Sequence, residues 1–259
     1  MAWTNADSWR RTGKGDPESW ISLPQHFKHH GYLTLGGGKT FHPGEPLLWD
    51  LPKSWSQKFV TFNTAQPLGY FNFELVHCPG DHDSLDTWCP LDGSLNQHYD
   101  YRLANWTINA LRYASRSPDN GVPWFIAAGF RRPHTPFKMP RQYWELYNES
   151  EIALASNSAW PTDAPAIAYH QAGFELGPVD GAAPSYLKVK PDINKPFAPN
   201  VSRAIRRAYY SCVSWQDSQI GRVLAELQYL QQENNTIVAI VGDHGVKLPI
   251  LNCAVSRGV

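Results

Sequence analysis

Three short segments of the chain combine residue types that can do chemistry on an anion. Residues 36–43 have the sequence Gly-Gly-Gly-Lys-Thr-Phe-His-Pro, residues 131–137 Arg-Arg-Pro-His-Thr-Pro-Phe, and residues 242–245 Gly-Asp-His-Gly. Each segment follows an apolar stretch that we expect to form a strand. Open α/β sheets place their ligand sites at the carboxyl ends of strands, so these segments are candidates for one site.

Lys39 is the cation of the first segment. It follows three glycines, so its ammonium group can approach an anion with little steric hindrance. An ordinary solvated loop lysine is the alternative interpretation. The segment lacks the G-x-x-x-x-G-K-[ST] pattern of a phosphate-binding loop, because Tyr32 and Leu33 stand where that pattern needs its first glycine. ATP binding is therefore disfavoured.

His134 is the titratable group of the second segment. It lies between Pro133 and Pro136, so the backbone is stiff and the imidazole is held in a defined direction. A rigidly placed imidazole suits a general acid. A proline-rich loop in which His134 packs against Phe137 explains the same residues equally well.

Asp243 and His244 follow the last apolar stretch. A carboxylate beside an imidazole at a strand end suits a hard or borderline divalent cation. On the tripeptide alone, a turn in which Asp243 caps a following helix and His244 is exposed is the better interpretation. The metal assignment therefore needs support from the other two segments.

Apolar periodicity predicts alternating helices and strands around these segments. Residues 151–199 are rich in Pro, Ala and Gly with little periodicity, so we expect a long surface excursion there. The nearly unbroken apolar run at 124–130 suits a strand covered on both faces, as in a mainly parallel sheet. We expect helices at 22–31, 99–117 and 201–232, and strands at 32–35, 124–130 and 237–241.

Composition excludes several classes of function. The 259 residues carry 23 Lys+Arg and 23 Asp+Glu, so no net charge favours nucleic acid as a partner. No stretch reaches the roughly 20 apolar residues of a membrane helix, so we expect no membrane insertion. Four cysteines without a C-x-x-C pair argue against structural zinc. Four N-x-[ST] sequons hint at secretion, although no signal peptide follows Met1.

Together, G-K-x-F-H-P, R-P-H-x-P-F and D-H-G resemble the sulfatase family, most closely its members that desulfate iduronate residues of glycosaminoglycans. The similarity runs from Ser8-Trp-Arg to Asp243-His-Gly, nearly the whole chain. It implies an α/β, alkaline-phosphatase-like fold with a central, mostly parallel sheet flanked by helices, incomplete in this chain. Residues 1–245 would be a partial N-terminal catalytic domain, and residues 246–259 a divergent tail.

The resemblance also implies roles for residues. Hydrolysis of a sulfate ester would use a formylglycine made from cysteine and one bound Ca²⁺. Lys39 would contact sulfate, His42 would steady the formylglycine hydroxyls, and His134 would bind sulfate near the leaving oxygen as the acid. Asp243 and His244 would belong to the calcium site, with His244 either as a ligand or as a neighbour of the ligands.

Further expectations follow from the same resemblance. The partners would be a sulfated glycosaminoglycan oligosaccharide and, for a full-length parent, the formylglycine-generating enzyme. The parent would be lysosomal or secreted. Cys78 and Cys89 match the position of a small disulfide loop in these enzymes.

The chain also departs from the family pattern. Paired aspartates and a C-x-P-S-R signature do not precede the first segment. The sequence Cys253-Ala-Val-Ser-Arg imitates the signature but has Val for Pro and follows D-H-G, so we interpret it as coincidence. We therefore expect a catalytically incomplete chain, with a non-catalytic sulfated-glycan binder as the alternative. A phosphodiesterase of the same superfold would need a Ser or Thr nucleophile and more metal ligands, a set that the sequence does not display.

Overall fold

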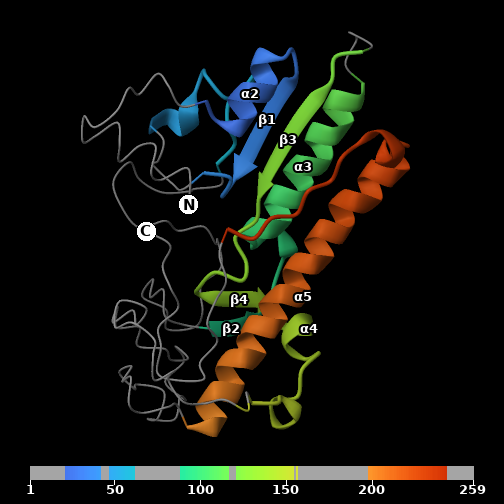
Figure 1. Ribbon diagram of the computed structural model, residues 1–259. Helices are drawn as coiled ribbons and strands as arrows, with labels where there is room; N and C mark the ends of the chain where they lie inside the picture. Colours follow the sequence, from blue (N-terminus) through green and yellow to red (C-terminus); the bar gives the residue numbers. More distant parts are fainter. Residues whose placement is uncertain are drawn as a thin grey trace, which may run out of the picture.

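The computed structural model describes residues 21–41, 47–61, 88–116, 121–154, 156 and 198–243, and the strands in these ranges form two small parallel sheets. In one, β1 (Leu33–Gly38) pairs with β3 (Trp124–Gly129). In the other, β2 (Trp88–Leu91) pairs with β4 (Phe137–Pro140). Helices flank both sheets (Figure 1), so the predicted α/β class with parallel strands is confirmed.

Helix α2 (Leu23–His29) precedes β1 and has a sequence-encoded start and stop. Ser22 accepts a hydrogen bond from the backbone N–H of Gln25 at 3.1 Å, and the Gln25 side chain returns the contact, which completes a capping box. Gly31 has a φ of +81°, a left-handed conformation that glycine adopts without strain. The predicted helix at 22–31 is confirmed.

Two long helices cover the sheets. Helix α3 (Tyr99–Ser115) lies between the β1–β3 sheet and α5 (Pro199–Tyr229), and α5 continues past the second sheet (Figure 1). The two helices are joined by a bidentate ion pair, in which Arg112 donates to both oxygens of Glu226 at 2.8 Å. Both predicted helices are confirmed within a few residues.

The second sheet packs on the N-terminal half of α5. Phe137 and Met139 of β4 share a buried cluster with Ile205, Cys212 and Trp215 of α5. All five side chains are at most 1% exposed. Cys212 lies on the buried face of its helix, and its thiol faces the Lys138 carbonyl at 3.8 Å.

Short elements connect these parts of the chain. The predicted excursion at 151–199 falls almost entirely outside the described residues. Among the helices that are described, none has the length and apolar character needed to cross a membrane. The short elements are α4 (Arg141–Trp144) and 3₁₀ turns at Leu47–Asp50, Leu95–Gln97, Glu149–Glu151 and Glu233–Asn235.

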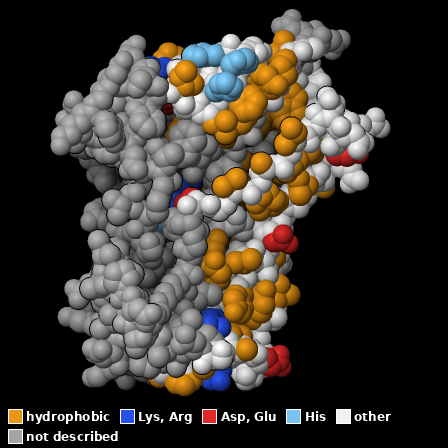
Figure 2. Space-filling view, viewed as in Figure 1, with side chains coloured by type: hydrophobic (Ala, Val, Ile, Leu, Met, Phe, Trp, Pro, Cys, Tyr) orange, Lys and Arg blue, Asp and Glu red, His pale blue; other side chains and the backbone are white. Residues whose placement is uncertain are grey.

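The predicted strand at 237–241 is wrong. Residues 236–242 have no regular secondary structure, and Ile237 and Val241 are 97% and 85% exposed. A β-prone run becomes a strand only when a neighbour completes its hydrogen-bond ladder, and no strand within the described ranges pairs with this segment. Figure 2 shows hydrophobic side chains exposed on the face where the chain runs from α5 towards Asp243.

Strand β1 is longer than predicted, because its glycines belong to the strand. A Cβ on Gly36 would lie 2.5 Å from the Trp55 ring, and one on Gly37 would lie 2.9 Å from the Trp106 ring. The bare backbone therefore lets the two indoles cover opposite sides of the strand. Lys39 consequently lies directly at the carboxyl end of β1.

Candidate active site

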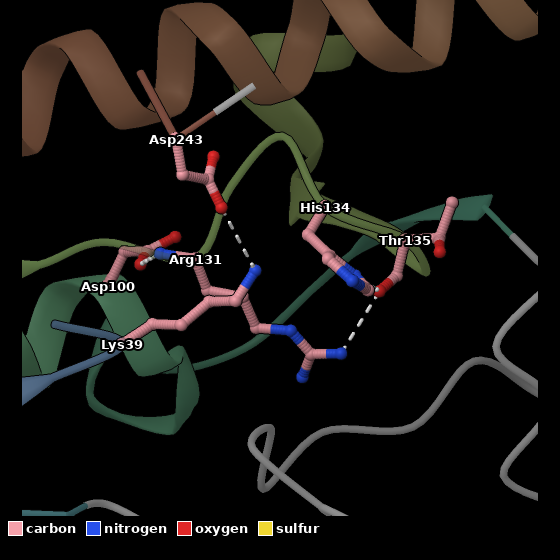
Figure 3. A network of polar contacts seen from close by, with 6 residues as sticks. All are labelled: Lys39, Asp100, Arg131, His134, Thr135 and Asp243. Carbon is pink, nitrogen blue, oxygen red and sulfur yellow. Dashed lines mark hydrogen bonds and ion pairs between the residues drawn. The ribbon is translucent and has the colours of Figure 1, made fainter. Parts of the chain in front are cut away.

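Parallel pairing of β1 and β3 brings two of the three predicted segments together. Gly38 stands opposite Gly129, and the backbone N–H of Lys39 donates to the Gly129 carbonyl at 2.6 Å. The loop that follows β3 therefore begins beside Lys39. Figure 3 shows the Lys39 and Arg131 side chains side by side, with His134 on the same loop as Arg131.

Lys39 is the central cation of this site. Its side chain is 21% exposed, and its Nζ lies 3.7 Å from Oδ2 of Asp243 (Figure 3). Burial lowers the pKa of the Lys39 ammonium group, the Asp243 carboxylate opposes that shift, and the Arg131 charge adds to it. All three predicted segments thus contribute a side chain to one place, although Asp243 remains 63% exposed.

His134 has a defined tautomer. Its Nδ1 lies 2.5 Å from the carbonyl oxygen of Thr135. Because a carbonyl oxygen only accepts hydrogen bonds, the ring hydrogen lies on Nδ1, and Nε2 carries the lone pair in the neutral form. Burial, followed by the charges of Lys39 and Arg131, lowers the pKa of His134 to about 3. The ring is therefore neutral at pH 7, and Nε2 is an acceptor when no anion is present.

Arg131 belongs to the site and was missed by sequence reasoning. Its side chain is 6% exposed, and one guanidinium nitrogen donates to the Thr135 carbonyl at 3.0 Å. Its charge acts on both Lys39 and His134. The doubled arginine directly after an apolar run was the available signal, because arginine is almost never fully buried unless it is paired.

His42 and His244 lie outside the described residues, as does Cys78. Cys89 is disulfide-bonded, which agrees with a bridge at this cysteine, while its pairing with Cys78 stays a prediction.

Asp243 offers the kind of oxygen ligand that Ca²⁺ prefers, but a calcium site takes six to eight oxygens. Within the described residues, no group of three or more His, Cys, Asp or Glu side chains is arranged to hold a metal. The described residues alone therefore do not complete a calcium site.

The fold and the site define an α/β protein with Lys39, Arg131 and His134 gathered at the carboxyl ends of parallel strands. The chain belongs to the sulfatase family, because the family model described as "Sulfatase" matches residues 4–250.

Individual relatives extend this result. The chain is 31% identical over 235 residues to iduronate 2-sulfatase of Homo sapiens, covering 86% of this chain and 40% of that protein. It is 25% identical over 258 residues to a sulfatase of Formosa agariphila, covering 88% of this chain and 42% of that protein. The chain thus spans about two fifths of the length of these curated relatives. A phosphonate monoester hydrolase structure from Agrobacterium radiobacter superimposes with a TM-score of 0.48 at 20% identity, over 81% of this chain and 44% of that one.

Proposed function

We propose that this chain contributes to a sulfuric ester hydrolase of the iduronate 2-sulfatase type, which removes sulfate from iduronate residues derived from glycosaminoglycans. Family membership and the human relative of that name support the proposal. The observation that carries it is the convergence of Lys39 and His134 at adjacent strand ends beside Arg131. The two cations would balance the charge of an incoming sulfate, and the half-buried imidazole would supply a group for proton transfer.

The charges suggest how the site handles a sulfate ester. Lys39 would bind a sulfate oxygen, and Asp243 holds the ammonium group in place until the anion enters. The anion would offset the positive charges of Lys39 and Arg131, which together with burial lower the pKa of His134. His134 would then take up a proton on Nε2 and donate it to the leaving sugar oxygen as the S–O bond breaks.

The other components of the reaction would come from a longer parent. There, a formylglycine would supply the nucleophile and a Ca²⁺ would stabilise charge on the sulfate oxygens, with Asp243 as one ligand. We retain His42 and His244 as proposed site residues on the basis of their motifs. Residues 1–245 would form part of the catalytic domain, and residues 246–259 a divergent tail.

Passage through the secretory route, to the lysosome or outside the cell, is part of the proposal. Asn148, Asn200 and Asn234 all lie in exposed positions where a glycan can be attached. Asn105 differs, because its side-chain oxygen accepts a hydrogen bond from Arg222 on the facing helix. We expect glycans at the three exposed sequons and none at Asn105.

A non-catalytic binder of sulfated glycans is the second candidate. It is favoured by the positive charges of Lys39 and Arg131 beside His134, which can hold an anion without any bond being broken. In that function Lys39 and His134 would hold a sulfate group and no bond would break.

Two measurements separate the candidates. The first is calorimetric titration of the 259-residue chain with inorganic sulfate and with a sulfated iduronate disaccharide. The second is turnover of that disaccharide by the chain and by a longer parent, both made with calcium in a host that generates formylglycine. Turnover by the parent alone supports the enzyme, and binding without turnover in either protein supports the binder. Failure of both binding and turnover would contradict both candidates.

A further inference from the structure

A buried carboxylate lies beneath the loop that carries His134. Asp100 is in the first turn of α3 and is 1% exposed. Its Oδ1 accepts the backbone N–H of Arg131 at 2.8 Å, and its Oδ2 accepts the backbone N–H of Arg132 at 3.1 Å. Figure 3 shows this contact at the point where the chain leaves β3.

The loop is also tied to itself by its own arginines. The Arg132 side chain donates to the His134 carbonyl at 3.0 Å and to the Lys138 carbonyl at 2.8 Å. The His134 backbone N–H donates to the Arg131 carbonyl at 2.9 Å, which closes a tight turn. The polar backbone groups of this turn are therefore occupied in one particular arrangement.

That arrangement aims the imidazole. The Thr135 carbonyl accepts from both the Arg131 guanidinium and Nδ1 of His134. The ring is thereby held by its Nδ1 edge, and Nε2 is left for the substrate. The direction of Nε2 depends on the course of the turn, and the turn begins at the two amides bound by Asp100.

We propose that Asp100 is a positioning residue for His134, which it directs towards the sulfate through the backbone of Arg131 and Arg132. Only the activity measurement that tests this inference depends on the proposed function. A carboxylate suits this role because it presents two acceptors to two successive N–H groups, and charge-assisted bonds of this kind are stronger than neutral ones. An amide at the same place keeps one acceptor and turns a donor towards the other N–H.

The activity test uses a longer parent enzyme that contains these residues. We expect Asp100→Ala to lower kcat by about 10- to 100-fold, as loss of a supporting contact typically does, with a smaller change in KM because Lys39 still binds sulfate. Asp100→Asn should recover part of the loss, since one acceptor remains. Asp92→Asn is the control, because Asp92 is a surface carboxylate paired with Arg141, and it should leave kcat unchanged.

A second test needs no sulfatase activity. In the 259-residue chain labelled with ¹⁵N-histidine and ¹⁵N-arginine, the wild-type His134 ring should give the Nδ1–H pattern, and the Arg131 and Arg132 amides should exchange slowly. Asp100→Asn should speed exchange at whichever of the two amides faces the new NH2 group and should mix the two ring tautomers. It is the informative variant if Asp100→Ala fails to fold.

The two tests separate the inference from the function on which it rests. If the parent has no turnover but Asp100→Asn changes the ring pattern and amide exchange, the proposed function fails and the positioning role stands. If Asp100→Asn leaves kcat, the tautomer and both exchange rates at wild-type values, the inference is overturned.

Discussion

The loop at 131–138 and the segment at 237–243 have the same kind of sequence and opposite structures. The loop follows an apolar, β-prone run, and the segment contains such a run. Both regions include polar residues suited to a site. The first is buried and tied by Asp100 and its own arginines. The second is exposed along its length and has no strand partner within the described ranges. The difference teaches that a strand-end motif becomes a rigid site only when neighbouring elements pair with it.

Removing either the Lys39 ammonium group or the His134 imidazole should have the largest effect. In a longer parent, Lys39→Ala and His134→Ala should each lower turnover of a sulfated iduronate disaccharide by on the order of 10² to 10³, the typical loss of one charge-stabilising contact. The measurement is steady-state kinetics. Wild-type rates in either variant would break the comparison, since the ordered region would then play no part in the chemistry.

Disturbing the contact between β1 and the loop should come next. A Cβ on Gly129 would lie 1.9 Å from the Thr40 nitrogen and 2.1 Å from the Lys39 carbonyl carbon. We expect Gly129→Ala to lower the free energy of unfolding by roughly 3 kcal/mol, the upper end for overpacking.

Gly221 of α5 supplies the matched control for this glycine. A Cβ there meets nothing within 4 Å, so Gly221→Ala should raise the free energy of unfolding by roughly 0.5–1 kcal/mol. Urea denaturation measures both variants. Equal effects at the two glycines would contradict the packing that we describe.

Acid should lower the free energy of unfolding through His98, which is buried, and His134, which is half-buried. Burial and nearby arginines lower the pKa of His98 to about 4, and burial with Lys39 and Arg131 lowers that of His134 to about 3. The unfolded chain takes up these protons as pH falls below about 6.5, whereas the folded chain resists them until the lower values. The free energy of unfolding should therefore fall by up to about 1.4 kcal/mol per pH unit for each histidine.

Denaturant titrations between pH 7 and pH 4 measure this slope. His134→Asn should reduce the pH dependence of the free energy of unfolding by the contribution of one histidine. The substitution leaves the contacts of Asp100 and Arg132 in place. An unchanged slope in His134→Asn would show that His134 titrates normally in the folded chain.

The exposed segment should give the smallest effect. Val241 is 85% exposed, so Val241→Ser should change the free energy of unfolding by less than about 0.5 kcal/mol. Leu35 of β1, at 5% exposed, is the matched position in a paired strand, and Leu35→Ala should cost about 2–5 kcal/mol. A large loss in Val241→Ser would show that the segment is packed in solution and would remove the contrast.

Local patterns made much of the fold predictable. The capping residues around α2, the helical spacing in α3 and α5, and the apolar run of β3 each specify an element through neighbours in the chain. The glycines of β1 were harder to interpret, because the indoles of Trp55 and Trp106 that fill their space are distant in sequence.

The site was predictable in part for the same reason. Lys39, His134 and Asp243 stand out by residue type after apolar runs, and the structure brings all three into one region. Asp100 carried no such signal, because an aspartate in the first turn of a helix is ordinary. Its role depends on Arg131, from which it is separated by 31 residues in sequence.

The sequence by itself determined which residues could do the chemistry and which helices would form, because composition and short-range periodicity act within a few residues. Only the tertiary structure decided that His134 is neutral, with Nε2 left for substrate, since its pKa follows from burial and from the charges of Lys39 and Arg131. It also decided that β1 and β3 pair while residues 237–241 stay exposed. Strand pairing and desolvation depend on partners brought together by the fold, and no local pattern encodes them.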